Sequence, residues 1–280
     1  MPAYRSMTRA ALDAAYNNSA AVADSARRIE TWTERTRRLR AERSELLDLA
    51  YGPAPRSKLD LYRSGRPEAP LLAFIHGGYW QRNSKEVFGC MAEGLLQRGV
   101  DAAVIGYTLA PDASLRAIEA EIAAAIVWLR SAGPRIGVAR GALVVAGWSA
   151  GGHLTARAMG HTGVTAGLAI SGIFDLEPIR ASYINDKLRL DARDAAALSP
   201  IGNPPPRSGP LTIAVGTAEL PELQRQSRDF HAAWAARGLP VSLLAAEGKD
   251  HFSILDELAS PTGLLAEEVL RLARAGGADR

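Results

Sequence analysis

The sequence predicts an α/β protein with one mostly parallel sheet of eight strands, helices on both of its faces and a helical extension at the N-terminus. Short continuous apolar runs alternate with segments of helical periodicity, which is typical of parallel strands buried on both faces. Alternation of apolar and polar residues marks two segments near the start and indicates half-exposed edge strands. Because the chain has 280 residues, of which 47% are hydrophobic, we expect a single domain over residues 1–280.

The expected elements follow from this pattern in chain order. A helical pattern over residues 8–41 breaks near Asn17, so residues 1–45 are expected to form a helical segment. The strands are expected at 47–51, 58–62, 71–75, 102–105, 142–146, 167–170, 211–215 and 241–245, and the first two form an antiparallel pair. The main helices are expected at 86–98, 114–130, 152–160, 221–237 and 261–275. Residues 173–210 lack periodicity and form either a lid or substrate loop or a plain surface excursion.

Composition and charge restrict the class of protein. The formal net charge of +3 is small, and the densest charge run, residues 27–43, mixes arginine with glutamate as a solvated helix does, so no nucleic-acid partner is expected. Cys90 is the only cysteine, and its apolar surroundings indicate a buried free thiol. The N-terminus lacks the apolar core of a signal peptide, and no apolar run of about 18 residues or more occurs. We therefore expect a cytoplasmic protein with no membrane partner.

A strand, a sharp turn and a helix meet around Ser149. The apolar strand at 142–146 leads into the string Gly-Trp-Ser-Ala-Gly at 147–151, and a helical pattern continues to about residue 160. The two glycines let the strand and the helix pass close to a strained turn that exposes the serine hydroxyl. The string is weak by itself, so the residues that end the other strands decide its meaning.

The strand at 71–75 ends in the string His-Gly-Gly-Tyr-Trp at 76–80. Consecutive glycines let the main chain come close to a substrate, so that backbone N–H groups can point at a developing oxyanion. The N–H of Ala150, directly after the serine, would supply another donor. A plain turn is the alternative interpretation of the paired glycines.

An acid and then a histidine are expected downstream of the serine. His251 follows the last predicted strand, where it can accept the proton of Ser149 and later protonate a leaving group. Glu219 follows the preceding strand and is the natural acid to orient the imidazole. Glu222, in the first turn of the next helix, is the main alternative, although the helix dipole already explains an acid there. Asp250 adjoins the histidine and is expected to diverge from its ring.

These motifs, in this order on this series of strands, resemble the α/β-hydrolase superfamily. The string at 76–80 and residues 215–227 are similar to the arylformamidase (kynurenine formamidase) branch, which is related to the hormone-sensitive-lipase type of esterase. That branch normally has Asp where Glu219 stands, so the acid of this chain is one methylene longer. The resemblance begins near residue 47, and the string Tyr-Asn-Asn at 16–18 is similar to bacterial members of the group. By analogy with the family, residues 1–45 and 173–210 are candidates for a cap over the site.

The resemblance implies a metal-independent serine hydrolase. In this hypothesis Ser149 attacks a carbonyl, His251 accepts its proton and Glu219 stabilises the imidazolium. The oxyanion hole is assigned to the main-chain N–H groups of Gly78, Tyr79 and Ala150. No cofactor or metal is implied, since water releases the acyl group. For an arylformamidase the substrate is N-formylkynurenine, which is hydrolysed to kynurenine and formate.

Three aromatic residues flank the proposed site in sequence. Tyr79, Trp80 and Trp148 could present an aromatic wall to an aryl substrate. Alternatively, Trp148 packs beneath the serine turn and Trp80 packs against the following helix. A small-molecule acyl substrate is the expected partner, and a homodimer is compatible with the sequence. Two other functions remain open: a carboxylesterase acting on short-chain acyl or aryl esters, and a non-catalytic ligand-binding module on a hydrolase scaffold.

Overall fold

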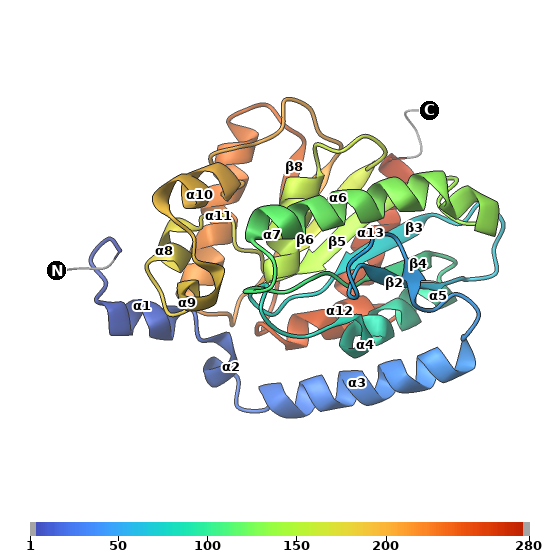
Figure 1. The fold of residues 1–280 in the computed structure, drawn as a ribbon, viewed down its shortest axis with the longest axis horizontal. Helices are drawn as coiled ribbons and strands as arrows, with labels where there is room; N and C mark the ends of the chain where they lie inside the picture. Colours follow the sequence, from blue (N-terminus) through green and yellow to red (C-terminus); the bar gives the residue numbers. More distant parts are fainter. Residues whose placement is uncertain (1–3, 277–280) are drawn as a thin grey trace.

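The computed structural model describes residues 4–276, in which eight strands form one sheet with the order β1-β2-β4-β3-β5-β6-β7-β8 (Figure 1). β2 is antiparallel to both of its neighbours, and the other strand pairs are parallel. The strands are β1 (Leu49–Ala50), β2 (Lys58–Tyr62), β3 (Leu71–Ile75), β4 (Asp101–Ile105), β5 (Leu143–Trp148), β6 (Ala166–Ile170), β7 (Leu211–Gly216) and β8 (Val241–Ala246). The predicted mostly parallel sheet is confirmed, and each strand begins and ends close to its expected position.

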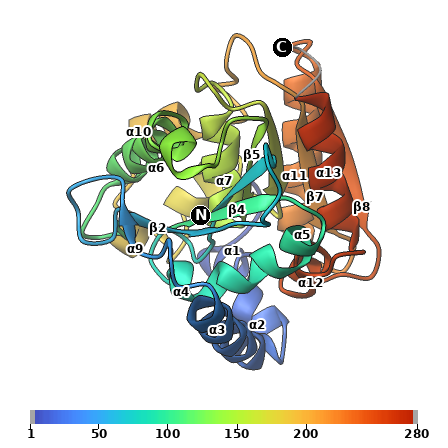
Figure 2. The same cartoon turned by 90° about the vertical axis from the view of Figure 1, so that its right-hand side faces the viewer.

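The central strands are apolar throughout because helices cover both faces of the sheet (Figure 2). In β3, Leu71, Ala73 and Ile75 face one apolar core, whereas Leu72 and Phe74 face the other. The first face is covered by α6 (Leu115–Ser131), α7 (Ala150–Ala158) and α11 (Pro221–Ala235). The second face is covered by α4 (Lys85–Phe88), η1 (Gly89–Ala92), α5 (Glu93–Gln97), α12 (Asp256–Ala259) and α13 (Leu264–Ala275). Two further single turns are η2 (Gly133–Ile136) and η3 (Ser253–Leu255).

The N-terminal segment forms three helices where two were expected, namely α1 (Arg9–Ala15), α2 (Asn18–Ala21) and α3 (Ser25–Glu42). The polar break was expected near Asn17, and the side chain of that residue caps α2 by accepting a hydrogen bond from the N–H of Ala20. In Figure 1, α3 runs beneath α4 and α12, and its Trp32 and Leu39 are buried in the core on that side of the sheet. The N-terminal segment therefore packs along the body of the protein.

Residues 173–210 carry three short helices rather than an extended loop: α8 (Glu177–Arg180), α9 (Asn185–Leu188) and α10 (Ala192–Leu198). Their apolar side chains, such as Ile179 and Leu188, are buried in the core on the α6 side. The N–H of Tyr183 donates to Asp13 of α1 at 2.8 Å, which joins this region to the N-terminal segment. Across residues 4–276, no helix combines the length and the hydropathy needed to cross a membrane.

Candidate active site

Ser149 occupies the sharp turn between β5 and α7. Its backbone has φ 57° and ψ −116°, a left-handed conformation that L-residues rarely adopt. The flanking glycines are needed because a Cβ at Gly147 would collide with the carbonyl of Gly151, and one at Gly151 would collide with that of Ile75. The sequence therefore folds into the strained turn that the motif predicts, with the serine at the carboxyl edge of the sheet.

The loop after β3 lies directly beside this turn. Ile75 pairs with Gly147 in the parallel ladder, so β3 and β5 end at the same level. Gly77 then packs so closely on Trp148 and Ser149 that a side chain there would overlap the indole. Gly78 and Tyr79 follow with φ 119° and 53°, so the chain turns sharply just above the serine.

His76 supports this loop from the core and does not face the cavity. Its ring stacks on Tyr107 with the ring centroids 4.3 Å apart, and its Nδ1 lies 2.9 Å from the carbonyl oxygen of Gly77. Complete burial lowers the pKa of His76 to about 4, so the ring stays neutral near pH 7. The amide of Asn83 donates to the same Gly77 carbonyl at 3.2 Å. These contacts hold the loop after β3 in place beside the serine turn.

Glu219 and His251 come together at the ends of β7 and β8. His251 Nδ1 lies 2.8 Å from Glu219 Oε2, and both side chains are buried. The other oxygen of Glu219, Oε1, accepts hydrogen bonds from Ser171 Oγ at 2.6 Å and from the N–H of Gly216 at 2.8 Å. An acceptor next to Nδ1 places the proton of the neutral imidazole on that atom and leaves Nε2 free to accept one.

The alternative acid, Glu222, has other partners. Its carboxylate accepts from Arg225 at 2.7 Å and from the hydroxyl of Tyr16 at 3.2 Å. Asp250, the neighbour of the histidine, accepts from the N–H groups of Phe252 and Ser253 at 2.8 Å. The structure thus brings Glu219, and neither of the two other acids, into contact with His251.

Trp148 supports the histidine in a way that the sequence did not indicate. Its indole Nε1–H donates to the backbone carbonyl of His251 at 2.7 Å, and the two rings lie 4.9 Å apart. Trp32 of α3 packs edge-on against Trp148 with a centroid separation of 6.1 Å. Trp148 therefore lines the site and also ties the loop after β8 to the serine turn.

A cavity of about 430 Å³ opens at this edge of the sheet and contains Ser149 and His251. Its walls come from two parts of the chain, the loops after β3, β5 and β8 and the N-terminal helices α2 and α3. The lining residues are Asn18, Ser19, Ser25, Ala26, Ile29, Glu30, Gly78, Tyr79, Arg82, Asn83, Trp148, Ser149, His251 and Phe252. The segment 1–45 thus contributes to the walls. Residues 173–210, for which a lid or substrate loop and a plain surface excursion were both open, supply none of these lining residues.

Tyr79 connects the two parts of the wall. Its hydroxyl donates to the backbone carbonyl of Tyr16, and the amide nitrogen of Asn18 donates to the Tyr79 oxygen at 3.1 Å. Burial raises the pKa of Tyr79 well above its ordinary value, so the hydroxyl keeps its proton. The only sign of this contact in the sequence was the Tyr-Asn-Asn string at 16–18. Reasoning from the sequence did not assign Asn18 to the site.

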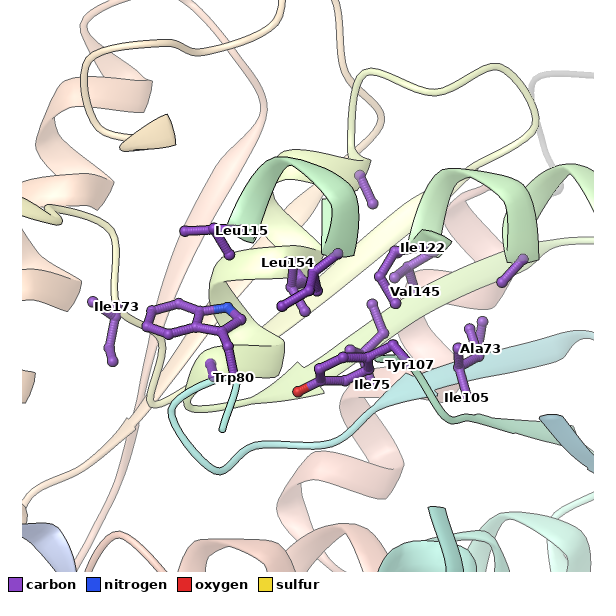
Figure 3. Packing of buried hydrophobic residues seen from close by; sticks show 14 of the residues in the cluster. Ala73, Ile75, Trp80, Ile105, Tyr107, Leu115, Ile122, Val145, Leu154 and Ile173 are labelled. Atoms are coloured by element: carbon purple, nitrogen blue, oxygen red, sulfur yellow. The ribbon is translucent and has the colours of Figure 1, made fainter. Parts of the chain in front are cut away.

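Trp80 lies elsewhere, so the expectation that it contacts a substrate is not supported. Its side chain is fully buried and packs edge-on against His153, with the ring centroids 5.1 Å apart. Figure 3 shows its ring in the core between Ile173 and Leu154. The positive φ of Tyr79 and Trp80 turns successive side chains into different surroundings, which explains why adjacent aromatic residues do not share one wall.

Donors for an oxyanion are present beside the serine. In the part of the chain from residue 4 to 276, no hydrogen bond uses the backbone N–H of Gly78, Tyr79 or Ala150. The N–H of Ala150 is the first of α7, where no carbonyl of the same helix can reach it. Residues 4–276 contain no group of three or more His, Cys, Asp or Glu side chains that could hold a metal ion. The arrangement suits nucleophilic attack on a carbonyl with charge stabilisation by the main chain.

Comparisons with known proteins agree with this geometry. The family model BD-FAE matches residues 59–169. A kynurenine formamidase of Danio rerio is 31% identical over 252 residues, which cover 85% of each chain. The esterase LipC of Mycobacterium tuberculosis is 28% identical over 242 residues, 74% of this chain and 59% of that one.

A solved structure shares the fold over nearly the whole chain. It comes from Silicibacter sp. TM1040 and was described as that of a candidate thioesterase; its TM-score is 0.81 at 30% identity, with 91% of this chain and 97% of the other covered. The fold, the serine turn and the relative from Danio rerio agree with one another. This chain belongs to the kynurenine formamidase branch of the α/β-hydrolase superfamily.

Proposed function

We propose that the protein is a serine hydrolase that cleaves N-formylkynurenine to kynurenine and formate, with Ser149, His251 and Glu219 as its catalytic triad. One observation carries the proposal: the Glu219–His251 pair, joined at 2.8 Å, opens on the same cavity as the serine on its strained turn. The substrate is proposed from the similarity to the kynurenine formamidase of Danio rerio.

The first half of the reaction forms a formyl-enzyme. The Ser149 hydroxyl attacks the formyl carbon while its proton passes to Nε2 of His251. The Glu219 carboxylate holds the Nδ1–H and stabilises the imidazolium, and Ser171 and Gly216 hold the carboxylate in turn. The imidazolium then gives its proton to the anilide nitrogen. The C–N bond breaks and kynurenine leaves as a neutral arylamine.

Water completes the second half. His251 accepts a proton from water, whose oxygen attacks the formyl ester, and the returning proton restores the Ser149 hydroxyl as formate leaves. In both halves the oxyanion accepts hydrogen bonds from the main-chain N–H groups of Gly78, Tyr79 and Ala150. Removing one donor of this kind typically raises the barrier by about 3 kcal/mol.

Every proton in this scheme is moved by a side chain or by water, so the mechanism needs neither a metal nor an organic cofactor. We therefore expect activity to survive prolonged treatment with EDTA. Inactivation by EDTA that is reversed by zinc would contradict the metal-independent mechanism.

A carboxylesterase acting on short-chain acyl or aryl esters is the second candidate. The similarity to the esterase LipC favours it, and the same triad would serve an ester equally well. The two substrate classes differ in the leaving atom, because an anilide needs its nitrogen protonated and an alcohol or phenol leaves more easily. The relative rates on amides and esters therefore separate the two candidates.

The test compares kcat/KM for N-formylkynurenine with that for p-nitrophenyl acetate and p-nitrophenyl butyrate. We expect the formamide to be the best of the three substrates, and a formamide rate no higher than the uncatalysed background would rule out the formamidase. Stoichiometric labelling by an organophosphate probe, lost in Ser149→Ala, is expected for either enzyme. Failure of the probe to label the wild-type protein would favour a non-catalytic binding module.

A further inference from the structure

Asn18 lies in the wall of the cavity that holds the proposed triad, and it carries a buried hydrogen-bond acceptor that none of residues 4–276 uses. Its side chain is only 3% exposed, and the residue lines the cavity together with Ser149 and His251. Its amide nitrogen donates to the hydroxyl oxygen of Tyr79, but its Oδ1 has no hydrogen-bond partner among residues 4–276. A buried carbonyl oxygen without a donor is unfavourable, so the position is suited to a ligand that brings one.

The orientation of the amide is fixed by the proton of Tyr79. That hydroxyl has a single proton, and it is donated to the backbone carbonyl of Tyr16. The Tyr79 oxygen can therefore only accept from Asn18, which must turn its amide nitrogen towards the ring. If the amide were flipped, Asn18 Oδ1 would face the Tyr79 oxygen, and neither atom would have a proton to donate. The free Oδ1 is thus a consequence of the hydrogen-bond network and not of an arbitrary choice between nitrogen and oxygen.

An anilide and an ester differ in the group that this oxygen can recognise. The scissile nitrogen of an anilide carries an N–H donor, whereas the corresponding ester oxygen carries only lone pairs. We infer that Asn18 Oδ1 accepts a hydrogen bond from the scissile N–H of the substrate, and that this contact makes the site prefer anilides to the matching esters. The inference rests on the proposed function and names the residue that selects its substrate class.

The chemistry of the leaving group gives the contact a role in the reaction. During attack the nitrogen becomes pyramidal, and its lone pair has to face the proton on His251 before the C–N bond breaks. A hydrogen bond to the N–H holds the nitrogen in one orientation, and that hydrogen stays on the departing amine. Asn18 also donates to the Tyr79 hydroxyl, but that hydroxyl keeps its own hydrogen bond to the backbone carbonyl of Tyr16 when the Asn18 amide is removed.

The test uses two substrates that differ only at the scissile atom, formanilide and phenyl formate, with the spontaneous hydrolysis of the ester subtracted. In Asn18→Leu, we expect kcat/KM for formanilide to fall by about 10- to 100-fold and that for phenyl formate to change by less than about 3-fold. The retained esterase activity reports that the variant is folded with its triad intact. Asn17→Ser is the matched control, since Asn17 is the exposed neighbour and serine can keep the cap of α2, and its amide-to-ester ratio is expected to equal that of the wild type.

Tyr79→Phe separates recognition of the N–H from support of the loop. This variant loses the hydroxyl that supports the loop and also orients the Asn18 amide, so we expect kcat/KM to fall for phenyl formate as well as for formanilide, unlike in Asn18→Leu. If Asn18→Leu lowered kcat/KM equally for both substrates, the inference would be overturned. Asn18 would then act only as a support for Tyr79. If Asn18→Leu lowered kcat/KM for N-formylkynurenine but not for formanilide, the inference would also be overturned. Asn18 would then bind the ammonium group of the substrate and not the scissile N–H. A wild-type protein without formamide activity would instead contradict the proposed function itself.

Discussion

The two walls of the cavity are held in place by different kinds of contact. The strand-end wall presents Ser149, Glu219 and His251 from the ends of β5, β7 and β8, and main-chain ladders across the sheet fix their relative positions. The N-terminal wall, residues 8–42, is joined to the body by side chains, with Trp32 as its largest buried contact. Its ion pairs to the rest of the described chain are Arg9–Asp186, Arg28–Asp256, Arg35–Glu93, Arg40–Asp48 and Arg40–Asp60.

This difference indicates that the two walls have different roles. A ladder of backbone hydrogen bonds in a buried sheet is cooperative and rigid, as suits residues whose spacing determines the chemistry. Partly exposed ion pairs contribute only about 0–1 kcal/mol each, so the N-terminal wall depends mainly on its few buried side chains. We expect changes in the strand-end wall to cause large losses on all substrates. Changes in the N-terminal wall are expected to affect stability, substrate preference and, by smaller factors, the rate.

The largest effect is expected from Glu219→Gln in the strand-end wall. The glutamine amide cannot stabilise the imidazolium, and its nitrogen can push the neutral ring into the wrong tautomer. We predict that kcat falls by about 1,000-fold or more for N-formylkynurenine and for p-nitrophenyl acetate alike. Steady-state kinetics on both substrates measure this.

Glu222→Gln is the matched control for this prediction. Glu222 lies one helical turn further on and pairs with Arg225, so its replacement is expected to lower kcat by less than about 10-fold. A loss in Glu222→Gln as large as that in Glu219→Gln would contradict the assignment of the acid.

Trp32→Ala tests the main buried contact of the N-terminal wall. The Trp32 ring packs on Phe88, Trp148 and Phe252 at centroid separations of 5.7, 6.1 and 6.2 Å. Truncation is expected to lower the free energy of unfolding by about 3–5 kcal/mol. Because Trp148 holds the carbonyl of His251, we also expect kcat/KM to fall by about 10-fold in the folded variant. Denaturant unfolding and kinetics on the folded protein give the two quantities.

Trp234→Ala separates the loss of stability from the loss of activity. Trp234 is equally buried but packs on Phe230 in α11, away from the lining of the cavity. It should lose a similar amount of stability while kcat/KM stays within about 2-fold of the wild type. The division between the two walls would be wrong if both variants lost activity to the same extent.

The two walls also differ in how far the sequence predicted them. The strands could be located because their apolar runs are local in the sequence. The loops that carry the candidate catalytic residues begin where those strands end. Ser149, Glu219 and His251 were therefore placed at one edge of the sheet, and the structure brings them to one site. Their catalytic roles stay a prediction until the kinetics above are measured.

The N-terminal wall could not be predicted in the same way, since its contacts join residues that are far apart in the chain. The contact between Asn18 and Tyr79 spans 61 residues, and that between Tyr16 and Glu222 spans 206. No local pattern encodes such pairs. The sequence left open whether Trp80 faces a substrate or the core for a related reason, because its side-chain direction depends on a left-handed backbone that the sequence of a non-glycine residue does not reveal.

The smallest effect is expected at Cys90, which can report whether the N-terminal wall leaves the body while the enzyme works. Cys90 is fully buried in η1, and its N–H donates to Thr36 of α3 at 3.0 Å. Burial raises the pKa of its thiol to about 11, so little thiolate exists at pH 8. Ionisation therefore destabilises the folded state only as the pH rises from the ordinary thiol pKa of about 8.5 towards 11.

We predict that an aromatic disulfide reagent at pH 8 modifies Cys90 at least about 100-fold more slowly in the folded protein than in guanidinium, with activity unchanged during the exposure. Cys90→Ala gives the background rate. In Trp32→Ala, whose α3 has lost its main buried contact, the labelling should accelerate well before global unfolding. Rapid labelling of the fully active wild type would mean that α3 leaves the body without harm to the site. That result would remove the N-terminal wall from the working cavity and leave the strand ends to select the substrate alone.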